Sequence, residues 1–159
     1  MVTQDRLHEL FDYKDGQLIA KIKRKRRNVG DVMGSKTDRG YLAVCVDGKN
    51  YKVHRIIYLY HHGNLPEQID HINGIRTDNR IENLRPATDL QNSQNRKPLA
   101  KSGVKGVYWN KRSKKWVANI CVNRKNKHLG SFKTLEEAAM IATAERLAAH
   151  KDYAWKGEK

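Results

Sequence analysis

Four polar side chains near the middle of the chain have the types and spacing of a hydrolytic site. Asp70 and His71 are adjacent. Asn83 follows twelve residues after the histidine, and Asn92 nine residues later. Hydrolysis of a phosphodiester needs three things, which are an activated water, neutralisation of the charge on the phosphoryl group and help for the leaving oxygen. A histidine can activate the water. A hard divalent ion held by the oxygens of Asp70 and Asn92 supplies the latter two, so we predict a one-metal site for cutting nucleic acid.

Short strands are expected around the acid–histidine pair. Residues 68–72 have the pattern of a strand that ends at a turn signal, Asn73-Gly74. A second extended piece covers residues 81–84 and is expected to end at Pro86. Because neighbouring side chains on a strand point to opposite faces, the acid and the histidine can line one cleft only where the strand ends or twists.

A capped helix is expected to present the last of the four residues. Thr88 and Gln91 have the spacing of a capping box. The helix predicted over residues 89–97 places Asn92 one turn from its start. The remaining asparagines of this region are assigned to the backbone geometry of turns, and they are Asn73, Asn79 and Asn95.

The segment before the site is expected to begin with a helix and continue as β-structure. Residues 1–12 have the apolar spacing of a short helix, with Thr3 at its N-cap. Asp47-Gly48 separates two strand-like runs and suits a type I′ hairpin turn. A helix follows the second run. His54 stands at that junction, where a histidine is more often a structural hydrogen-bonder than a catalytic group.

The composition points to a polyanionic partner. The 159 residues carry a net charge of +15, with 38% hydrophobic and 31% charged residues. Self-repulsion from such an imbalance disfavours a compact state, so a nucleic acid is the first partner to consider and an anionic membrane the second. No apolar run approaches the ~20 residues of a membrane span, and no secretory signal opens the chain. We expect a soluble cytoplasmic protein that does not bind membranes.

The positive charge is concentrated in two places. Residues 97–133 contain eleven Lys and Arg and no acidic residue, which argues for a phosphate-facing surface. Residues 23–27 are five consecutive cations. That run is either a solvated loop or a loop that clamps the nucleic-acid backbone.

The two cysteines predict neither a disulfide framework nor a structural zinc site. Cys45 and Cys121 are far apart, each inside a predicted strand, and no CxxC pair is present. We expect two buried or half-buried thiols.

The central motifs resemble the HNH endonuclease superfamily, in the phage and homing-endonuclease branch where asparagine replaces the last histidine. The matching segments are 53–55, 69–74, 77–80, 82–85 and 91–92. The resemblance implies a ββα-metal core with His71 as general base, Asp70 and Asn92 as metal ligands and Asn83 as the anchor of the loop. It also implies one Mg²⁺ or Mn²⁺ per active site, and products with 5′-phosphate and 3′-hydroxyl ends.

The pattern changes after a linker-like segment at residues 97–103. Strands are predicted over 106–110, 116–122 and 127–132, followed by a capping box from Thr134 and an Ala-rich helix to about residue 150. This part resembles the ethylene-response-factor (Apetala-type) DNA-binding domain, in which a three-stranded sheet enters the major groove. The helix face expected to pack on the sheet comprises Leu135, Ala138, Ala139, Ala142 and Leu147.

The second resemblance implies a set of DNA-facing side chains on the sheet. By position these are Lys105, Tyr108, Asn110, Asn119, Cys121 and His128. Cations in or beside the turns are expected to reach phosphates, and they are Arg112, Lys114, Lys115, Arg124 and Lys127. Further candidates before the linker are Arg24, Arg26, Arg27 and Arg55. Either Trp109 or Trp116 can stack on nucleic acid, but the core is favoured for Trp116, and packing roles are expected for Phe132 and Trp155.

Together these patterns predict an α+β protein of two domains. The first, residues 1–96, is a nuclease domain with a β-rich extension and a ββα-metal core at about 53–96. The second, residues 104–155, is a three-stranded antiparallel sheet packed on one helix. The predicted function is a metal-dependent endonuclease that nicks or cuts double-stranded DNA at preferred sites, as a monomer or homodimer, in the host cytoplasm if phage-encoded. The alternatives are a sequence-specific DNA-binding regulator with a vestigial nuclease site and, less favoured, an RNA-binding or RNA-cutting protein.

Overall fold

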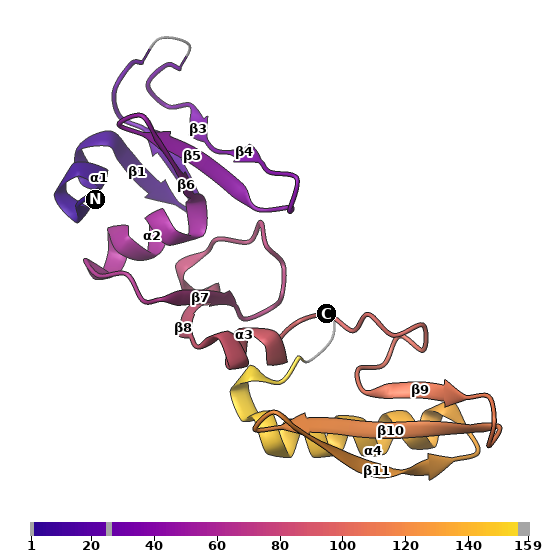
Figure 1. Ribbon diagram of the computed structural model, residues 1–159. Coiled ribbons are helices and arrows are strands. Elements are labelled where there is room, and N and C mark those ends of the chain that lie inside the picture. The colour runs from indigo at the N-terminus through magenta and orange to yellow at the C-terminus, as the bar shows by residue number, and fades with distance from the viewer. Residues whose placement is uncertain (1, 25–26, 156–159) are drawn as a thin grey trace. The chain divides into compact units, whose positions relative to one another are not determined.

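The computed structural model describes residues 2–24 and 27–155, so the candidate Arg26 lies outside the described residues. The chain forms two compact units, Met1–Asp89 and Leu90–Lys159 (Figure 1). The division falls at the start of the helix expected to carry Asn92, whereas the linker was expected after that helix. Each unit mixes helices with antiparallel strands, so the α+β prediction is confirmed.

The first unit opens with a short helix and two small antiparallel sheets. Helix α1 (Gln4–Leu10) has Thr3 as its N-cap, as predicted, with the hydroxyl accepting from N of Arg6. The first sheet has the order β1-β2-β3, with strands β1 (Phe11–Lys14), β2 (Gln17–Ala20) and β3 (Val32–Met33). The second has the order β4-β5-β6, with strands β4 (Ser35–Lys36), β5 (Leu42–Val46) and β6 (Lys49–Lys52).

The hairpin turn at Asp47-Gly48 is confirmed, since both residues have positive φ and join β5 to β6.

Helix α1 ends earlier than expected. Phe11 is 3% exposed and pairs with Ala20 across the first sheet, so it belongs to a strand and not to the helix. Tertiary pairing therefore overrides the helical spacing of residues 1–12.

A helix, a two-stranded hairpin and a second short helix follow. They are α2 (Val53–His62), β7 (Gln68–His71), the 3₁₀ turn η1 (Ile81–Asn83), β8 (Leu84–Ala87) and α3 (Asp89–Gln94). Pro86 lies inside β8, opposite Ile69, and not after the strand as predicted. A two-stranded sheet has only edge strands, where the missing N–H of proline is tolerated. Helix α3 also ends sooner than the expected residue 97.

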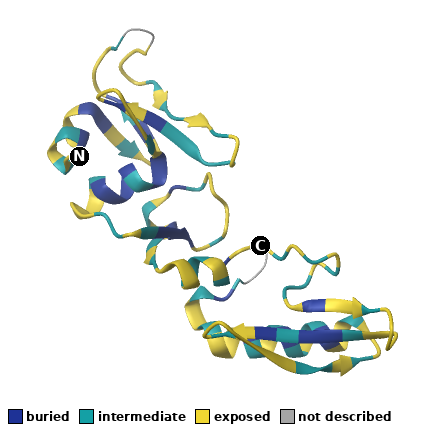
Figure 2. Ribbon diagram, in the orientation of Figure 1, coloured by how far each residue is buried: buried dark blue, intermediate teal, exposed yellow. Residues whose placement is uncertain are grey.

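The first unit has one hydrophobic core beneath these elements. It is built mainly from α1, α2 and the inner faces of the strands, as the dark-blue segments of Figure 2 show. Leu7, Leu18, Ile56 and Ile57 are fully buried. Burying a side chain of this size contributes about 1.5–3 kcal/mol, so these contacts make α2 the element on which the strands and the following hairpin are assembled.

The second unit is a three-stranded antiparallel sheet with a helix along one face (Figure 1), as predicted. The sheet order is β11-β10-β9. The strands are β9 (Val107–Asn110), β10 (Lys115–Val122) and β11 (Lys125–Phe132), and α4 (Leu135–His150) and the turn η2 (Lys151–Tyr153) follow. The Thr134 capping box is confirmed, with both of its hydrogen bonds to Glu137 formed. Trp116 and Phe132 pack against the core, as expected.

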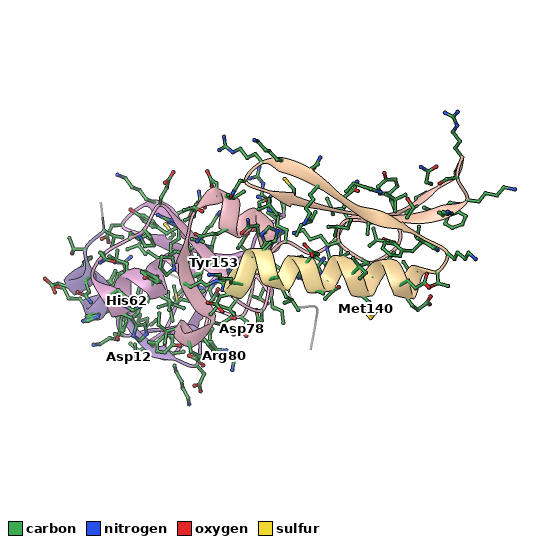
Figure 3. The ribbon with its side chains drawn as sticks, turned by 90° about the horizontal axis from the view of Figure 1, so that it is seen from below. Asp12, His62, Asp78, Arg80, Met140 and Tyr153 are labelled. Carbon is green, nitrogen blue, oxygen red and sulfur yellow. The ribbon has the colours of Figure 1, made fainter. Side chains whose placement is uncertain are left out.

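One position of the predicted packing face of α4 is wrong. Ala138 and Ala142 are buried as expected, but Leu147 is 42% exposed. Arg146 takes the buried place one residue earlier and is 5% exposed. The outward face of α4 is marked by Met140, which points away from the sheet in Figure 3.

Both cysteines are free and exposed, which contradicts the expectation of buried or half-buried thiols. Cys45 lies between buried Val44 and Val46 on β5, so the alternation of the strand turns it outward. In the part of the chain that the structure describes, no helix combines the length and the hydropathy of a membrane span.

Candidate active site

The imidazole of His71 is buried at the end of β7 and is held by the loop that follows. His71 is 5% exposed, and its Nε2 donates to Oδ1 of Asn79 over 3.0 Å. This bond keeps the proton of the neutral ring on Nε2 and its basic lone pair on Nδ1. Burial lowers the pKa of His71, while the bond to Asn79 and the charge of Asp70 act in the opposite direction. The ring is therefore neutral at pH 7, which the general-base role expected of it requires.

Asn79 is the site residue that the sequence did not reveal. It was expected to serve only the backbone of a turn, yet it is 1% exposed and its amide is bonded to His71. Its own Nδ2 is buried and has no hydrogen-bond partner among the described residues. The spacing of eight residues between the two side chains matches no period of a helix or strand, so no local pattern signalled the contact.

The side chain of Asn83 closes the loop between β7 and β8. Its Oδ1 accepts from N of Asn73 over 3.0 Å, and its Nδ2 donates to Oδ1 of Asn73 over 3.0 Å and to O of Asp78 over 2.7 Å. Asp78 in turn pairs with Arg80 at 2.8 Å (Figure 3), and the hydrogen bond from Arg80 is the main cause that lowers the pKa of Asp78 to about 2. These contacts support the loop-anchoring role expected of Asn83.

The carboxylate of Asp70 lies next to His71 in the chain and is paired with a cation. Asp70 is 5% exposed. Arg85, its cross-strand partner on β8, donates from Nε over 3.0 Å and from Nη2 over 2.8 Å to the same oxygen, Oδ2. A buried carboxylate needs such a partner, and the guanidinium balances its charge within the hairpin itself.

A second histidine forms the inner wall beside His71. His54, on α2, is 4% exposed, and its ring centre lies 4.9 Å from that of His71 in an edge-on arrangement. The ring centre of Tyr41 lies 5.3 Å from that of His54 and 6.1 Å from that of His71. Burial, with the charge of His71 as the next cause, lowers the pKa of His54 to about 3. His54 therefore packs as a neutral ring, but its buried Nδ1 has no hydrogen-bond partner among the described residues, so the hydrogen bonding expected of this histidine is not seen at that atom.

The first hairpin of the chain supports the site loop from outside. The hydroxyl of Tyr13 accepts from N of Ile81 over 3.0 Å. At the β1–β2 turn, Gly16 has φ +82°, and a Cβ there would lie 2.7 Å from N of Arg80 and 2.9 Å from C of Asn79. Only glycine fits this close backbone approach, which brings the turn against the residue that holds His71.

The expected second metal ligand, Asn92, lies on α3 beyond the division between the units. Asp70 and His71 lie in the first unit. The ligand role of Asn92 therefore stays a prediction.

Two DNA-binding candidates of the first unit, Arg24 and Arg55, have hydrogen-bond partners within the protein. Arg24 donates to Asp47 over 3.1 Å. Arg55 donates to the carbonyl oxygens of Glu67 and Pro66, over 3.1 and 3.4 Å. Arg27 is exposed.

The candidates of the second unit lie on or beside the three-stranded sheet. Tyr108 is 48% exposed, and Asn119 and His128 are cross-strand partners joined by a 3.0 Å hydrogen bond. Oδ1 of Asn110 accepts from the backbone of the turn that follows β9. The ammonium of Lys105 is bonded to carbonyl oxygens before the sheet. Besides Tyr108, the exposed candidates are Arg112, Lys114, Lys115, Cys121, Arg124, Lys127 and His128.

Comparison with known families agrees with this geometry. Residues 51–94 match the HNH endonuclease family, and residues 102–151 match the AP2 domain. The chain contains an HNH endonuclease domain and an AP2 domain. The HNH match covers α2, the β7–β8 hairpin and α3, whereas the AP2 match covers the three-stranded sheet and α4. Both resemblances found in the sequence are confirmed.

A relative of the chain is Protein 3.8 of Escherichia phage T7, which is 35% identical over 80 residues. The match spans 49% of this chain and 66% of the phage protein. No solved structure gives a significant match.

Proposed function

We propose that the protein is a metal-dependent DNA endonuclease in which the HNH domain cuts and the AP2 domain holds or selects DNA. The observation that carries this proposal is the setting of His71, a buried neutral imidazole whose Nε2 is bonded to Asn79. That bond leaves the basic lone pair on Nδ1, which is the atom that would take the proton from an attacking water. The loop pinned by Asn83 keeps the ring in this orientation.

The donor set suits a magnesium or manganese ion. No group of three or more His, Cys, Asp or Glu side chains forms a metal cage in the part of the chain that the structure describes. Mg²⁺ commonly uses one or two protein carboxylates, keeps several waters and completes its shell with substrate phosphate oxygens. Asp70, with the amide oxygen proposed for Asn92, fits that pattern. The ion would neutralise charge on the phosphoryl group and assist the leaving oxygen.

The remaining side chains hold and orient DNA around this centre. Arg85 balances Asp70 and lies close enough to the site to meet a phosphate that approaches it. Cations in or beside the turns of the AP2 sheet are proposed to contact the DNA backbone, and they are Arg112, Lys114, Lys115, Arg124 and Lys127. The attack on the phosphodiester is proposed to leave 5′-phosphate and 3′-hydroxyl ends.

A plasmid assay tests the proposal. The full chain and its His71→Ala variant are incubated with supercoiled plasmid and phage genomic DNA, first with Mg²⁺ or Mn²⁺ and then with EDTA. Cleavage by the wild-type chain that needs metal, and is lost in the variant while DNA binding remains, is the expected result. One active site per chain makes nicked circles the first product of a monomer, whereas linear DNA as first product indicates a dimer.

The second candidate is a DNA-binding regulator with a vestigial nuclease site. The ion pair between Asp70 and Arg85 favours it, because the carboxylate proposed as metal ligand already has a cationic partner. Wild-type protein that binds DNA through its AP2 domain but cleaves none of these substrates with either metal would support the regulator.

A further inference from the structure

Helix α3 belongs to the HNH domain by sequence but to the AP2 unit by packing. The HNH match ends at residue 94 and the AP2 match begins at residue 102. The compact unit that contains the AP2 sheet nevertheless begins at Leu90. Leu90, Ser93 and Gln94 share the walls of a cavity of about 280 Å³ with residues of β10 and α4. Asn92, the proposed metal ligand, is therefore carried by a helix that packs within the AP2 unit.

One side chain binds the end of this helix. Nζ of Lys105 donates to the carbonyl oxygens of Ser93, Gln94 and Arg96, over 3.0, 2.9 and 3.0 Å. The last carbonyls of a helix have no partner within it, and a cation at this end is favourable. An ammonium has three donors, so these bonds use its full capacity. Lys105 closes the C-terminal end of α3 and has no donor left for a phosphate while it does so.

Lys105 is itself fixed to the AP2 domain. Its carbonyl oxygen accepts from Nη1 of Arg146, a buried residue of α4, over 2.9 Å. The next residue, Gly106, accepts from N of Asn119 on β10 over 2.8 Å. The end of α3 is thus linked through one lysine to both the helix and the sheet of the AP2 domain.

The electrostatic setting agrees with a structural task for this lysine. Burial, with the charges of Arg146 and Arg96, lowers the pKa of Lys105 to about 8. A lysine that reaches out to a phosphate stays solvated and keeps its ordinary pKa until it binds. The resemblance to the AP2 family places Lys105 among the DNA-facing residues, whereas its contacts in the structure are those of a tether.

We propose that Lys105 is a positioning residue that ties α3 to the AP2 domain and so sets where Asn92 is presented for metal binding. This inference rests on the proposed function, because it takes Asn92 to be a ligand of the ion. The AP2 domain then has two tasks. It binds DNA, and it holds the helix that carries Asn92.

The test compares four full-length variants with the wild-type chain. Lys105→Met removes the ammonium, and Lys105→Arg keeps a cationic donor. Lys101→Met is the matched control, an exposed lysine of the same segment. Asn92→Ala removes the proposed ligand. Mn²⁺ binding to each protein–DNA complex is followed by loss of the free-ion electron paramagnetic resonance signal, and hydrogen exchange is followed in residues 89–97.

Lys105→Met is expected to weaken Mn²⁺ binding several-fold, in the same direction as Asn92→Ala, and to speed exchange in α3. DNA affinity in EDTA stays within twofold of the wild type, Lys105→Arg restores part of the metal affinity, and Lys101→Met changes nothing. A tenfold loss of DNA affinity in Lys105→Met, without a change in exchange, would make the lysine a phosphate contact and overturn the inference.

Two further outcomes separate this inference from the nuclease proposal. Unchanged Mn²⁺ affinity in Asn92→Ala removes this residue from the ligand set and overturns the coupling. Metal-dependent cleavage of plasmid by the wild-type chain decides the nuclease proposal independently of any Lys105 variant.

Discussion

Asn79 shows how a contact to a candidate catalytic residue can be hidden in a sequence. Its type and position suit a turn, and many asparagines in loops do no more than that. Its contact becomes visible only when the loop folds back and brings the amide oxygen 3.0 Å from Nε2 of His71. Arg85 is a similar case, because its pairing with Asp70 depends on the register of β7 against β8.

Replacing Asn79 with alanine is expected to lower the cleavage rate at saturating DNA much more than it lowers DNA affinity. Without the amide oxygen that accepts from Nε2, neither the tautomer nor the orientation of the His71 ring is fixed. General-base catalysis contributes about 10²–10⁴-fold to the rate of a reaction. We expect a loss of about tenfold or more in nicking rate, measured by gel assay of supercoiled plasmid. Asn64→Ala, at an exposed asparagine, is the control. Equal losses in both variants would show that the contact to His71 is unimportant.

His54 is expected to make the protein less stable in mild acid. Its pKa is about 3 in the folded protein and near 6.5 in the unfolded chain. Between these values the unfolded chain binds the extra proton, so stability is full above about pH 6.5 and falls as the pH drops toward 3. One such group contributes a slope of at most about 1.4 kcal/mol per pH unit.

His54→Phe keeps a ring of similar size and removes this titration. The free energy of unfolding is measured by urea denaturation between pH 4 and 7. Its slope against pH is expected to become shallower by up to about 1.4 kcal/mol per pH unit, which corresponds to the uptake of one proton. The remaining slope includes contributions from His61, His71 and His150, whose pKa values are also lowered by burial. A variant with the full wild-type slope would show that His54 is not the residue that takes up the proton.

At the scale of elements, the β1–β2 turn determines the position of the site loop. Gly16→Ala is expected to destabilise the protein by roughly 1–3 kcal/mol, because the new Cβ meets the backbone of residues 79–80 and the backbone has positive φ. Gly40→Ala is the matched control, since Gly40 has φ +78° but no atom within 4 Å of its Cβ position. The difference between the two variants in urea denaturation isolates the steric contact. Equal destabilisation of both would assign the whole effect to backbone strain.

The elements that the sequence predicts well are those determined by their own residues. The Asp47-Gly48 turn and the Thr134 capping box depend on neighbours within four positions, and both are present as expected. The departures occur where distant parts of the chain decide. Phe11 joins a strand because Ala20 pairs with it, and Arg146 replaces Leu147 in the packed face of α4 because its guanidinium bonds the carbonyl of Lys105. The pattern of residues along one segment does not indicate which distant residues will contact it.

At the scale of the whole molecule, the proposed function assigns cutting to the HNH domain and most of the binding to the AP2 domain. Residues 1–96 carry 17 Lys and Arg against 12 Asp and Glu, whereas residues 97–159 carry 15 against 5. The second part therefore has twice the net positive charge of the first. Each phosphate contact adds affinity that falls with salt, so most of the salt-dependent binding is expected to reside in the AP2 domain.

Deleting residues 98–159 is expected to weaken DNA binding and broaden the choice of site while leaving some metal-dependent cutting at low salt. Because α3 loses its tether, the remaining activity is expected to need a higher metal concentration. Affinity is measured by fluorescence anisotropy at several salt concentrations, and cleavage by titration of Mg²⁺. A truncated chain with full affinity and an unchanged salt slope would refute the role given to the sheet.

The two exposed thiols give the molecule a built-in pair of reporter positions. Cys45 lies in the first unit and Cys121 in the second, and they are the two cysteines of the sequence. A thiol-reactive spin label or dye therefore attaches once to each unit of the native chain, without any substitution. Pulsed dipolar spectroscopy on the doubly labelled protein can then follow the spacing of the two domains as DNA is added.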